Sequence, residues 1–299
     1  MPNPTEEPRE HPSTYTVQDR SNLEEMTRLE IQDKMLTAGM GGVLSELANP
    51  TSLQRVLDVG CGTGGWLMET AKTYPTIKKL VGGDISGKMV AYAQAQAEGL
   101  GLSGRVHFQT MDALRALDFP ASSFDLVNLR AGFSWLRTWD WKKLLLEFQR
   151  VARPDGIIRI TEVDAWSGGN SPALTKLCDI GLEAFYNSGR LFTVSHNGLT
   201  SELPRLMTQH GFRDVQTRVH KLVYRPGMPE YQSFYQDMFH AFRVALPFLQ
   251  KWANVPKDYQ EIYQQALKEI QQPDFVVTWN MPTVWGRNPD KPMLMRGLQ

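Results

Sequence analysis

A short apolar segment that leads directly into closely spaced glycines constrains this chain more than any other feature. Residues 56–59 read Val-Leu-Asp-Val, and residues 60–65 read Gly-Cys-Gly-Thr-Gly-Gly. An apolar run of this length predicts a buried strand, and the glycines allow a tight turn that a ligand can approach closely. Amide groups at the start of the following helix favour an electron-rich ligand. The segment therefore predicts a strand, a glycine loop and a helix at a nucleotide-cofactor site.

The glycine spacing alone does not identify the cofactor. Gly60, Gly62 and Gly65 also match the G-x-G-x-x-G fingerprint of dinucleotide-binding folds. Two hypotheses are therefore open: a nicotinamide-dependent oxidoreductase, and an enzyme whose cofactor combines an adenosine with an amino acid.

Acidic residues at the ends of three predicted strands favour the second hypothesis. Asp58 lies two residues before the first glycine, where a carboxylate would repel a pyrophosphate and suits an ammonium group. Asp84 can accept hydrogen bonds from two ribose hydroxyls, which fits NAD equally well. Asp112 can accept from an adenine amino group while Met111 packs on the ring. A single Asp at such a position more often forms a turn or a helix cap, but acids at three successive strand ends favour a cradle for adenosine and an amino acid.

The rest of the chain alternates short apolar runs with helical patterns, which is typical of a parallel sheet covered by helices. Strands are predicted at residues 55–59, 79–84, 105–109, 124–129, 157–163, 215–224 and 275–285, and helices at 65–74, 87–99 and 141–151.

The predicted domain organisation has three parts. Residues 1–20 are polar and rich in proline, so we expect a mobile N-terminal arm. Residues 21–50 have helical periodicity and form either a lid or a part of the core packing. Residues 51–299 form the main domain, with helical insertions at about 165–210 and, as a helical hairpin, at about 228–272.

These motifs resemble those of class I S-adenosylmethionine-dependent methyltransferases. Residues 57–64 resemble the first motif of that family, and residues 83–86 followed by Met89 resemble the second. Residues 123–127 resemble the entry to the fourth strand, and residues 153–156 the turn before the fifth, with Asp155 in place of a usual second glycine. The resemblance covers roughly residues 55–224 and is nearest the branch that includes ubiquinone and menaquinone biosynthesis methyltransferases.

The resemblance implies an α/β fold with a seven-stranded, mostly parallel Rossmann-like sheet whose last strand is antiparallel. It also implies S-adenosylmethionine as the cofactor, with the glycine loop near the methionyl portion, Asp84 on the ribose and Asp112 near the adenine. The cofactor-binding residues implied in this way are Asp58, Gly60, Cys61, Gly62, Gly64, Asp84, Ile85, Met89, Met111, Asp112, Ala113 and Arg130.

The acceptor of the methyl group is not identified by the sequence. Aromatic side chains near the ends of the fourth and fifth strands and in the first insertion are candidates to enclose it: Phe133, Trp135, Trp166 and Tyr186. Glu162, by its position, and His196, because an imidazole titrates near neutral pH, are candidate catalytic bases. Each of these residues, taken alone, is more often a packing residue.

Composition limits the partners of the chain. Lys and Arg total 32, as do Asp and Glu, and no long basic run is present, so we expect no nucleic-acid substrate. No apolar stretch approaches the roughly 20 residues that span a bilayer, and no signal-peptide pattern begins the chain, so we expect a cytoplasmic protein without a membrane partner. The 2 cysteines and 6 scattered histidines indicate no metal site.

The sequence therefore predicts a methyltransferase that acts on a small molecule. Residues 127–130 after the fourth strand lack the Asn/Asp-Pro-Pro-aromatic signature of amino-group methylation on adenine or glutamine, which disfavours macromolecular targets. The aromatic stripe in residues 231–242 indicates core packing, a homodimer contact or a roof over the acceptor pocket. The alternatives are an NAD-dependent oxidoreductase and a non-catalytic regulator that binds S-adenosylmethionine.

Overall fold

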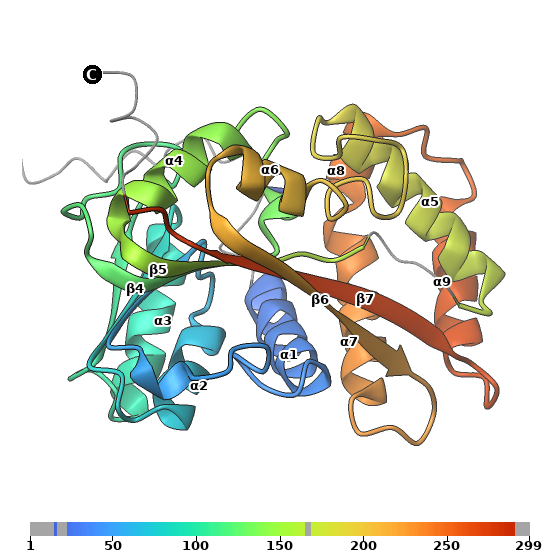
Figure 1. Ribbon diagram of the computed structural model, residues 1–299. Helices are drawn as coiled ribbons and strands as arrows, with labels where there is room; N and C mark the ends of the chain where they lie inside the picture. Colours follow the sequence, from blue (N-terminus) through green and yellow to red (C-terminus); the bar gives the residue numbers. More distant parts are fainter. Residues whose placement is uncertain (1–14, 17–22, 165–168, 291–299) are drawn as a thin grey trace, which may run out of the picture.

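A seven-stranded sheet forms the centre of the protein (Figure 1), whose computed structural model describes residues 15–16, 23–164 and 169–290. The strands are β1 (Arg55–Val59), β2 (Lys79–Asp84), β3 (Val106–Thr110), β4 (Phe124–Arg130), β5 (Ala152–Thr161), β6 (Arg213–Tyr224) and β7 (Val277–Arg287). Their order across the sheet is β3-β2-β1-β4-β5-β7-β6. The first five run parallel, and β7 runs antiparallel to both of its neighbours. The predicted fold class is confirmed.

Strand β5 is longer than the sequence predicts. Ala152 pairs with Phe124 of β4, and pairing resumes with a shifted register at Ile157. The intervening residues include Asp155 with a φ of +60°, so the predicted turn is a bulge inside the strand.

Helices cover both faces of the sheet. They are α1 (Leu23–Gly39), α2 (Gly65–Thr73), α3 (Gly87–Gly99), α4 (Trp141–Val151), α5 (Pro172–Asn187), α6 (Leu203–Gln209), α7 (Tyr231–Val244), α8 (Leu246–Trp252) and α9 (Tyr259–Ile270). The three predicted crossover helices agree with α2, α3 and α4. Across the described ranges, we find no helix with the length and apolar character that crossing a membrane requires.

The strands β6 and β7 continue well past the end of β5. Strand β5 pairs with β7 only between Thr283 and Arg287, whereas β6 pairs with β7 as far as Val277. The two strands therefore leave the sheet as a ribbon, which in Figure 1 reaches the group formed by α5, α7, α8 and α9. This ribbon places the inserted helices beside the main sheet.

The insertion before β7 consists of three helices, which corrects the predicted helical hairpin. Ala245 is the cap residue between the end of α7 at Val244 and the start of α8 at Leu246, and Pro247 lies in the first turn of α8. A proline inside a helix removes one backbone hydrogen bond and clashes with the preceding turn, so a single helix cannot run from residue 231 to residue 252. α7 packs on α1 and α9, while α5 packs on α8 and α9.

The described segment before β1 forms one α-helix, α1, followed by turns and a short 3-10 helix, Pro50–Ser52. α1 lies in contact with α2, α7 and β6 (Figure 1), so it bridges the main sheet and the inserted helices. The predicted arm lies almost entirely outside the described residues. Its described part, Tyr15 and Thr16, is bound to the body: the Thr16 amide donates to the Ser134 carbonyl at 3.0 Å, and the Tyr15 hydroxyl donates to Glu25 at 2.8 Å.

Candidate active site

The loop between β1 and α2 has a backbone conformation that favours glycine. Gly60, Gly62 and Gly64 have φ angles of +71°, +53° and +77°. A Cβ atom on Gly64 would lie 2.5 Å from a neighbouring side-chain atom, so no other residue fits there without a shift. The amides of Gly60 and Cys61 donate to the Gly83 carbonyl at 2.8 and 3.0 Å. The loop is therefore fixed against the end of β2.

The carboxylate of Asp84 also holds this loop. Its Oδ2 accepts a hydrogen bond from the Gly62 amide at 3.1 Å, and its Oδ1 accepts one from the Ser86 amide at 2.9 Å. The residue is buried, yet it lines the cavity described below. Asp84 therefore has the glycine loop on one side and the cavity on the other.

Asp58 begins a chain of buried polar groups that crosses the sheet. Asn128 Nδ2 donates to Asp58 Oδ1 at 2.7 Å, and Arg159 Nη1 donates to Asn128 Oδ1 at 2.7 Å. Arg159 in turn forms a buried ion pair with Glu46. Because a guanidinium can only donate, this chain fixes the Asn128 amide with its NH2 group toward Asp58.

The chain only partly compensates for the burial of Asp58. Burial raises the pKa of this carboxyl to about 7, while the hydrogen bond from Asn128 and the charge of Arg159 act in the opposite direction. Asp58 borders a hollow over the glycine loop. A cationic group bound in that hollow would favour the ionised carboxylate.

Asp112, the third of the acids predicted to bind the cofactor, stabilises the turn in which it lies. Asp112 Oδ1 accepts a hydrogen bond from the Leu114 amide at 2.9 Å, and Oδ2 lies 3.3 Å from Arg115 Nε. Asp112 does not line the cavity. This is the turn-forming role that an isolated Asp most often has.

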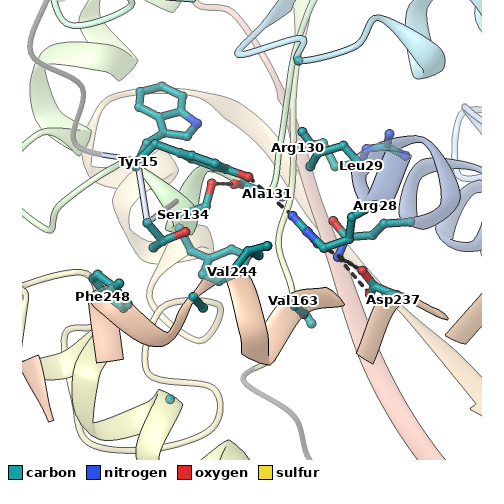
Figure 2. A pocket seen from close by; sticks show the side chains of 18 of the residues that line it. Tyr15, Arg28, Leu29, Arg130, Ala131, Ser134, Val163, Asp237, Val244 and Phe248 are labelled. Carbon is teal, nitrogen blue, oxygen red and sulfur yellow. Dashed lines mark hydrogen bonds and ion pairs between the residues drawn. The ribbon is translucent and has the colours of Figure 1, made fainter. Parts of the chain in front are cut away.

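One cavity of about 190 Å³ joins the glycine loop to a wide apolar surface. Gly60, Gly62, Asp84 and Met89 border one end of it. Figure 2 shows its walls, with Arg28 and Asp237 on one side and Tyr15 and Ser134 on another. The apolar surface is formed largely by Phe133, Trp135, Phe185, Met238, Phe242 and Phe248. A concave, aromatic wall with few polar groups is typical of a small-molecule site.

The structure brings together only a part of the predicted cofactor residues. Those that border the cavity or the adjoining hollow are Asp58, Gly60, Cys61, Gly62, Asp84, Met89 and Arg130. Those that border neither are Gly64, Ile85, Met111, Asp112 and Ala113. Gly64 and Met111 nevertheless lie close behind the site. Met111 packs against Gly83 at the end of β2, and Gly64 lies against Phe108.

Only some of the residues predicted to act at the acceptor line the cavity. Phe133 and Trp135 line the cavity. Tyr186 is 41% exposed and does not line it, because it lies on the outer side of α5. His196 is exposed on the loop between α5 and α6 and is also absent from the cavity wall. Trp166 lies outside the described residues.

Glu162 stands behind the cavity wall. It is fully buried, and its Oε2 accepts a hydrogen bond from the Phe133 amide at 3.2 Å. Burial raises the pKa of this carboxyl to about 8, although the amides of Gly132 and Phe133 oppose the shift. Glu162 therefore supports the turn that carries Phe133 and Trp135, and it does not itself border the cavity.

Arg130 connects the glycine loop to α1. It pairs with Asp33 of α1, and its Nη1 donates to Thr37 Oγ1 at 3.0 Å. Burial and the charge of Arg159 lower the pKa of Arg130 to about 9. Its charge lies at the boundary between the cavity and the hollow over the loop.

Several polar residues of the cavity wall were not predicted from the sequence: Tyr15, Thr16, Arg28, Gln32 and Asp237. A usable signal existed for Asp237, since it interrupts the apolar stripe of α7 between Phe234 and Met238. A carboxylate on the buried face of an amphipathic helix needs a partner, and such a residue is a candidate for a functional position.

Nothing in the described ranges indicates a metal site. Among residues 15–16, 23–164 and 169–290, no three His, Cys, Asp or Glu side chains lie close enough together to hold a metal ion.

Comparison with known proteins agrees with this site. A family model described as a methyltransferase domain matches residues 56–156. The demethylmenaquinone methyltransferase of Lactobacillus johnsonii is 32% identical over 171 residues, which are 53% of this chain and 68% of that protein. The demethylmenaquinone methyltransferase of Thermus thermophilus is 36% identical over 117 residues, 39% of this chain, and the match spans 50% of its length.

The fold is similar to that of the geranyl diphosphate C-methyltransferase from Streptomyces coelicolor A3(2). The TM-score is 0.52 at 11% identity, and the similarity covers 93% of this chain and 90% of that one. At this identity the comparison supports the fold alone. Together with the sequence relatives and the glycine loop, it shows that the chain belongs to the class I S-adenosylmethionine-dependent methyltransferases, near the ubiquinone and menaquinone biosynthesis branch.

Proposed function

We propose that this protein transfers a methyl group from S-adenosylmethionine to a small-molecule acceptor. One observation carries the proposal: the glycine loop and the carboxylate of Asp84 open into the same cavity as the aromatic side chains of Phe133 and Trp135. A cofactor held at the loop would therefore share a single space with an acceptor held by the aromatic wall.

The residues at the loop fit this cofactor. Asp84 offers a carboxylate of the kind that binds ribose hydroxyls. Asp58 is a buried acid whose ionised form a cationic ammonium group would stabilise, whereas a pyrophosphate would be repelled there. Gly60 and Gly62 have positive φ values, which favour glycine, and glycine has no side chain that would keep a ligand away from the backbone.

Bound S-adenosylmethionine supplies a methyl group that is already activated, so the remaining work of the protein is alignment and exclusion of water. The turn after β4 positions the acceptor. Ala131 begins this turn with a φ of +56°, and Glu162 holds the amide of Phe133, so that Phe133 and Trp135 enter the cavity. Neither Glu162 nor His196 borders the cavity, so their predicted role as bases has no support from this geometry.

We also propose that the protein acts in the cytoplasm and, because its charge is balanced, that it binds no nucleic acid. We further propose a homodimer, for which the half-buried Tyr235 and Phe239 of α7 offer contact surface. Sedimentation velocity tests the last point, and a single species with the mass of one chain would contradict it.

Calorimetry and turnover test the central proposal. S-adenosylmethionine is expected to bind and NAD is not. Asp84→Asn is expected to weaken cofactor binding at least about tenfold, because a charge-assisted hydrogen bond contributes about 1.5–3 kcal/mol. The exposed Asp118 provides the matched control Asp118→Asn, which should not change binding.

Turnover separates an enzyme from a non-catalytic binder. Protein with methyl-labelled S-adenosylmethionine and a metabolite extract should transfer label to a small organic molecule. Absence of S-adenosylmethionine binding, or binding of NAD in its place, would refute the proposal.

A further inference from the structure

A cluster of buried polar groups joins α1 to α7 at the cavity wall. Arg28 Nε and Nη2 both donate to the Glu25 carboxylate at 2.8 Å, and Arg28 Nη1 donates to Asp237 Oδ1 at 3.0 Å. The side chains of Glu25 and Asp237 are fully buried. The Tyr15 hydroxyl adds a third donor to Glu25 at 2.8 Å. A cluster with several charge-assisted bonds holds its members in one arrangement.

Gln32 is the member of this cluster that borders both the cavity and the hollow over the glycine loop. Its Nε2 donates to Asp237 Oδ2 at 3.1 Å and lies 3.4 Å from Oδ1. Asp237 is paired with Arg28, and an ionised carboxylate can only accept hydrogen bonds. The NH2 group of Gln32 must therefore face Asp237, which leaves the carbonyl oxygen Oε1 at the other end of the amide.

Gln32 lies at the boundary between the two spaces of the site. Gln32 lines the large cavity and also the hollow over the glycine loop, so it stands where the two meet. Its neighbours in that wall, Leu29 and Leu36, are apolar. The nearby Arg28 and Asp237 are bound to each other. An oriented acceptor oxygen beside them selects for a ligand that carries a hydrogen-bond donor.

We propose that Gln32 Oε1 accepts a hydrogen bond from a hydroxyl or amino group of the methyl acceptor, and that Asp237 and Arg28 are positioning residues that fix the Gln32 amide. The inference rests on the proposed methyltransferase function and names the acceptor class. The acceptor is a largely apolar molecule that contains a ring, packs against the aromatic cluster of Phe133, Phe185 and Phe248, and carries an O–H or N–H group at the end near the glycine loop.

Two probes that differ by one hydroxyl test this assignment. The dissociation constants of 4-propylphenol and propylbenzene are measured by equilibrium dialysis against full-length protein loaded with S-adenosylhomocysteine. The ratio of the propylbenzene constant to the 4-propylphenol constant reports the donor-selective contact. In Gln32→Leu this ratio is expected to fall about fivefold, the value expected for one neutral hydrogen bond.

Asp237→Asn tests the positioning role. This variant leaves the Arg28–Glu25 pair neutral, so it is expected to fold. Because Arg28 can only donate, it should bind the oxygen of the new amide and leave the NH2 group of that amide toward Gln32, which turns Gln32 Oε1 away from the cavity. The ratio should fall by a factor similar to that in Gln32→Leu. Glu24→Gln is the matched control: Glu24 also links α1 to α7, through His240 and Arg243, and does not line the cavity. Its ratio should stay at the wild-type value.

The outcomes separate this inference from the proposed function. A wild-type protein that fails to bind S-adenosylhomocysteine refutes the methyltransferase proposal. Intact S-adenosylhomocysteine binding with an unchanged probe ratio in Gln32→Leu refutes the role of Gln32 alone. Loss of S-adenosylhomocysteine binding in Gln32→Leu also overturns it, since Gln32 would then contact the cofactor.

Discussion

At the scale of single residues, Asp58 combines a cost in stability with a proposed role in cofactor binding. Its pKa is about 7 in the folded protein against an ordinary value of 3.8, because burial disfavours the ionised form. The folded state therefore holds a proton on Asp58 that the unfolded chain has already lost between these two values. Stability falls as the pH rises through this window, and the loss is complete above it.

Replacing Asp58 with Asn should therefore stabilise the ligand-free protein. Asn keeps an oxygen that can accept from Asn128 and carries no charge to desolvate. We expect the advantage of the variant to grow between about pH 4 and about pH 7 and to stay constant above, with a melting temperature at least about 2 °C higher at about pH 8. Calorimetric melting across this range, beside Asp118→Asn, measures it. A lower melting temperature at the alkaline end would show that Asp58 is not a buried, uncompensated charge.

The same substitution should weaken cofactor binding. An ionised Asp58 attracts a cationic ligand, so the affinity of the wild-type protein for S-adenosylmethionine should rise with pH up to about 7. In Asp58→Asn this rise should be absent, and above that pH the affinity should be about tenfold to a hundredfold lower. Titration calorimetry at several pH values provides the measurement, and parallel pH profiles for both proteins would contradict the role of Asp58.

Single residues of the site differ in how far the sequence could predict them. Asp58 and Asp84 follow from their spacing to the glycines, because strand ends in a parallel sheet lie at one edge. Gln32 and Asp237 are 205 positions apart in sequence and meet only through the packing of α1 on α7. No local pattern contains that contact.

At the scale of elements, the strands were predictable because burial on both faces leaves continuous apolar runs. The strand β4 is buried along nearly its whole length and was placed to within one residue. The inserted helices were less predictable, since the break at Ala245 depends on Pro247, a single residue inside an otherwise continuous helical pattern. The bulge in β5 has the local sequence of a turn around Asp155. The strand continues because β5 pairs with β4 on both sides of the bulge, a contact that the local sequence does not contain.

The contact between β5 and the segment before β1 should be sensitive to loss of one charge. Arg159→Met leaves Glu46 buried without its partner, and we expect a loss of about 3–5 kcal/mol in the free energy of unfolding. Arg205→Met, which breaks the largely exposed Arg205–Glu202 pair, should cost less than about 1 kcal/mol. Urea denaturation compares the two. Equal midpoints for the two variants would mean that the Arg159–Glu46 pair contributes nothing beyond a surface pair.

At the scale of the whole molecule, the cavity is built by segments from both ends of the chain. α1 and the glycine loop form one side, and α7 and α8 form the other. A ligand that binds the loop should therefore also order α1 through the Asp33–Arg130 pair, because both residues border the hollow over the loop.

Hydrogen exchange can detect this coupling. Saturation with S-adenosylhomocysteine at about 100 times its dissociation constant should stabilise the fold by about 2.7 kcal/mol. Amide protection should increase in residues 56–65 and also in α1. Helix α9 does not line the cavity, so those of its amides that exchange by local opening should not change and serve as an internal reference. Protection confined to the loop would show that α1 and the loop respond independently.

The ribbon formed by β6 and β7 has a consequence for how such a protein can diversify. The glycine loop follows one of the parallel strands, while a large part of the apolar cavity wall lies on helices inserted between two strands that project away from them. Changes in α7 or α8 can therefore alter that part of the cavity wall without disturbing the glycine loop. Related proteins with this fold can therefore acquire new acceptors through substitutions in these two helices while the reaction stays the same.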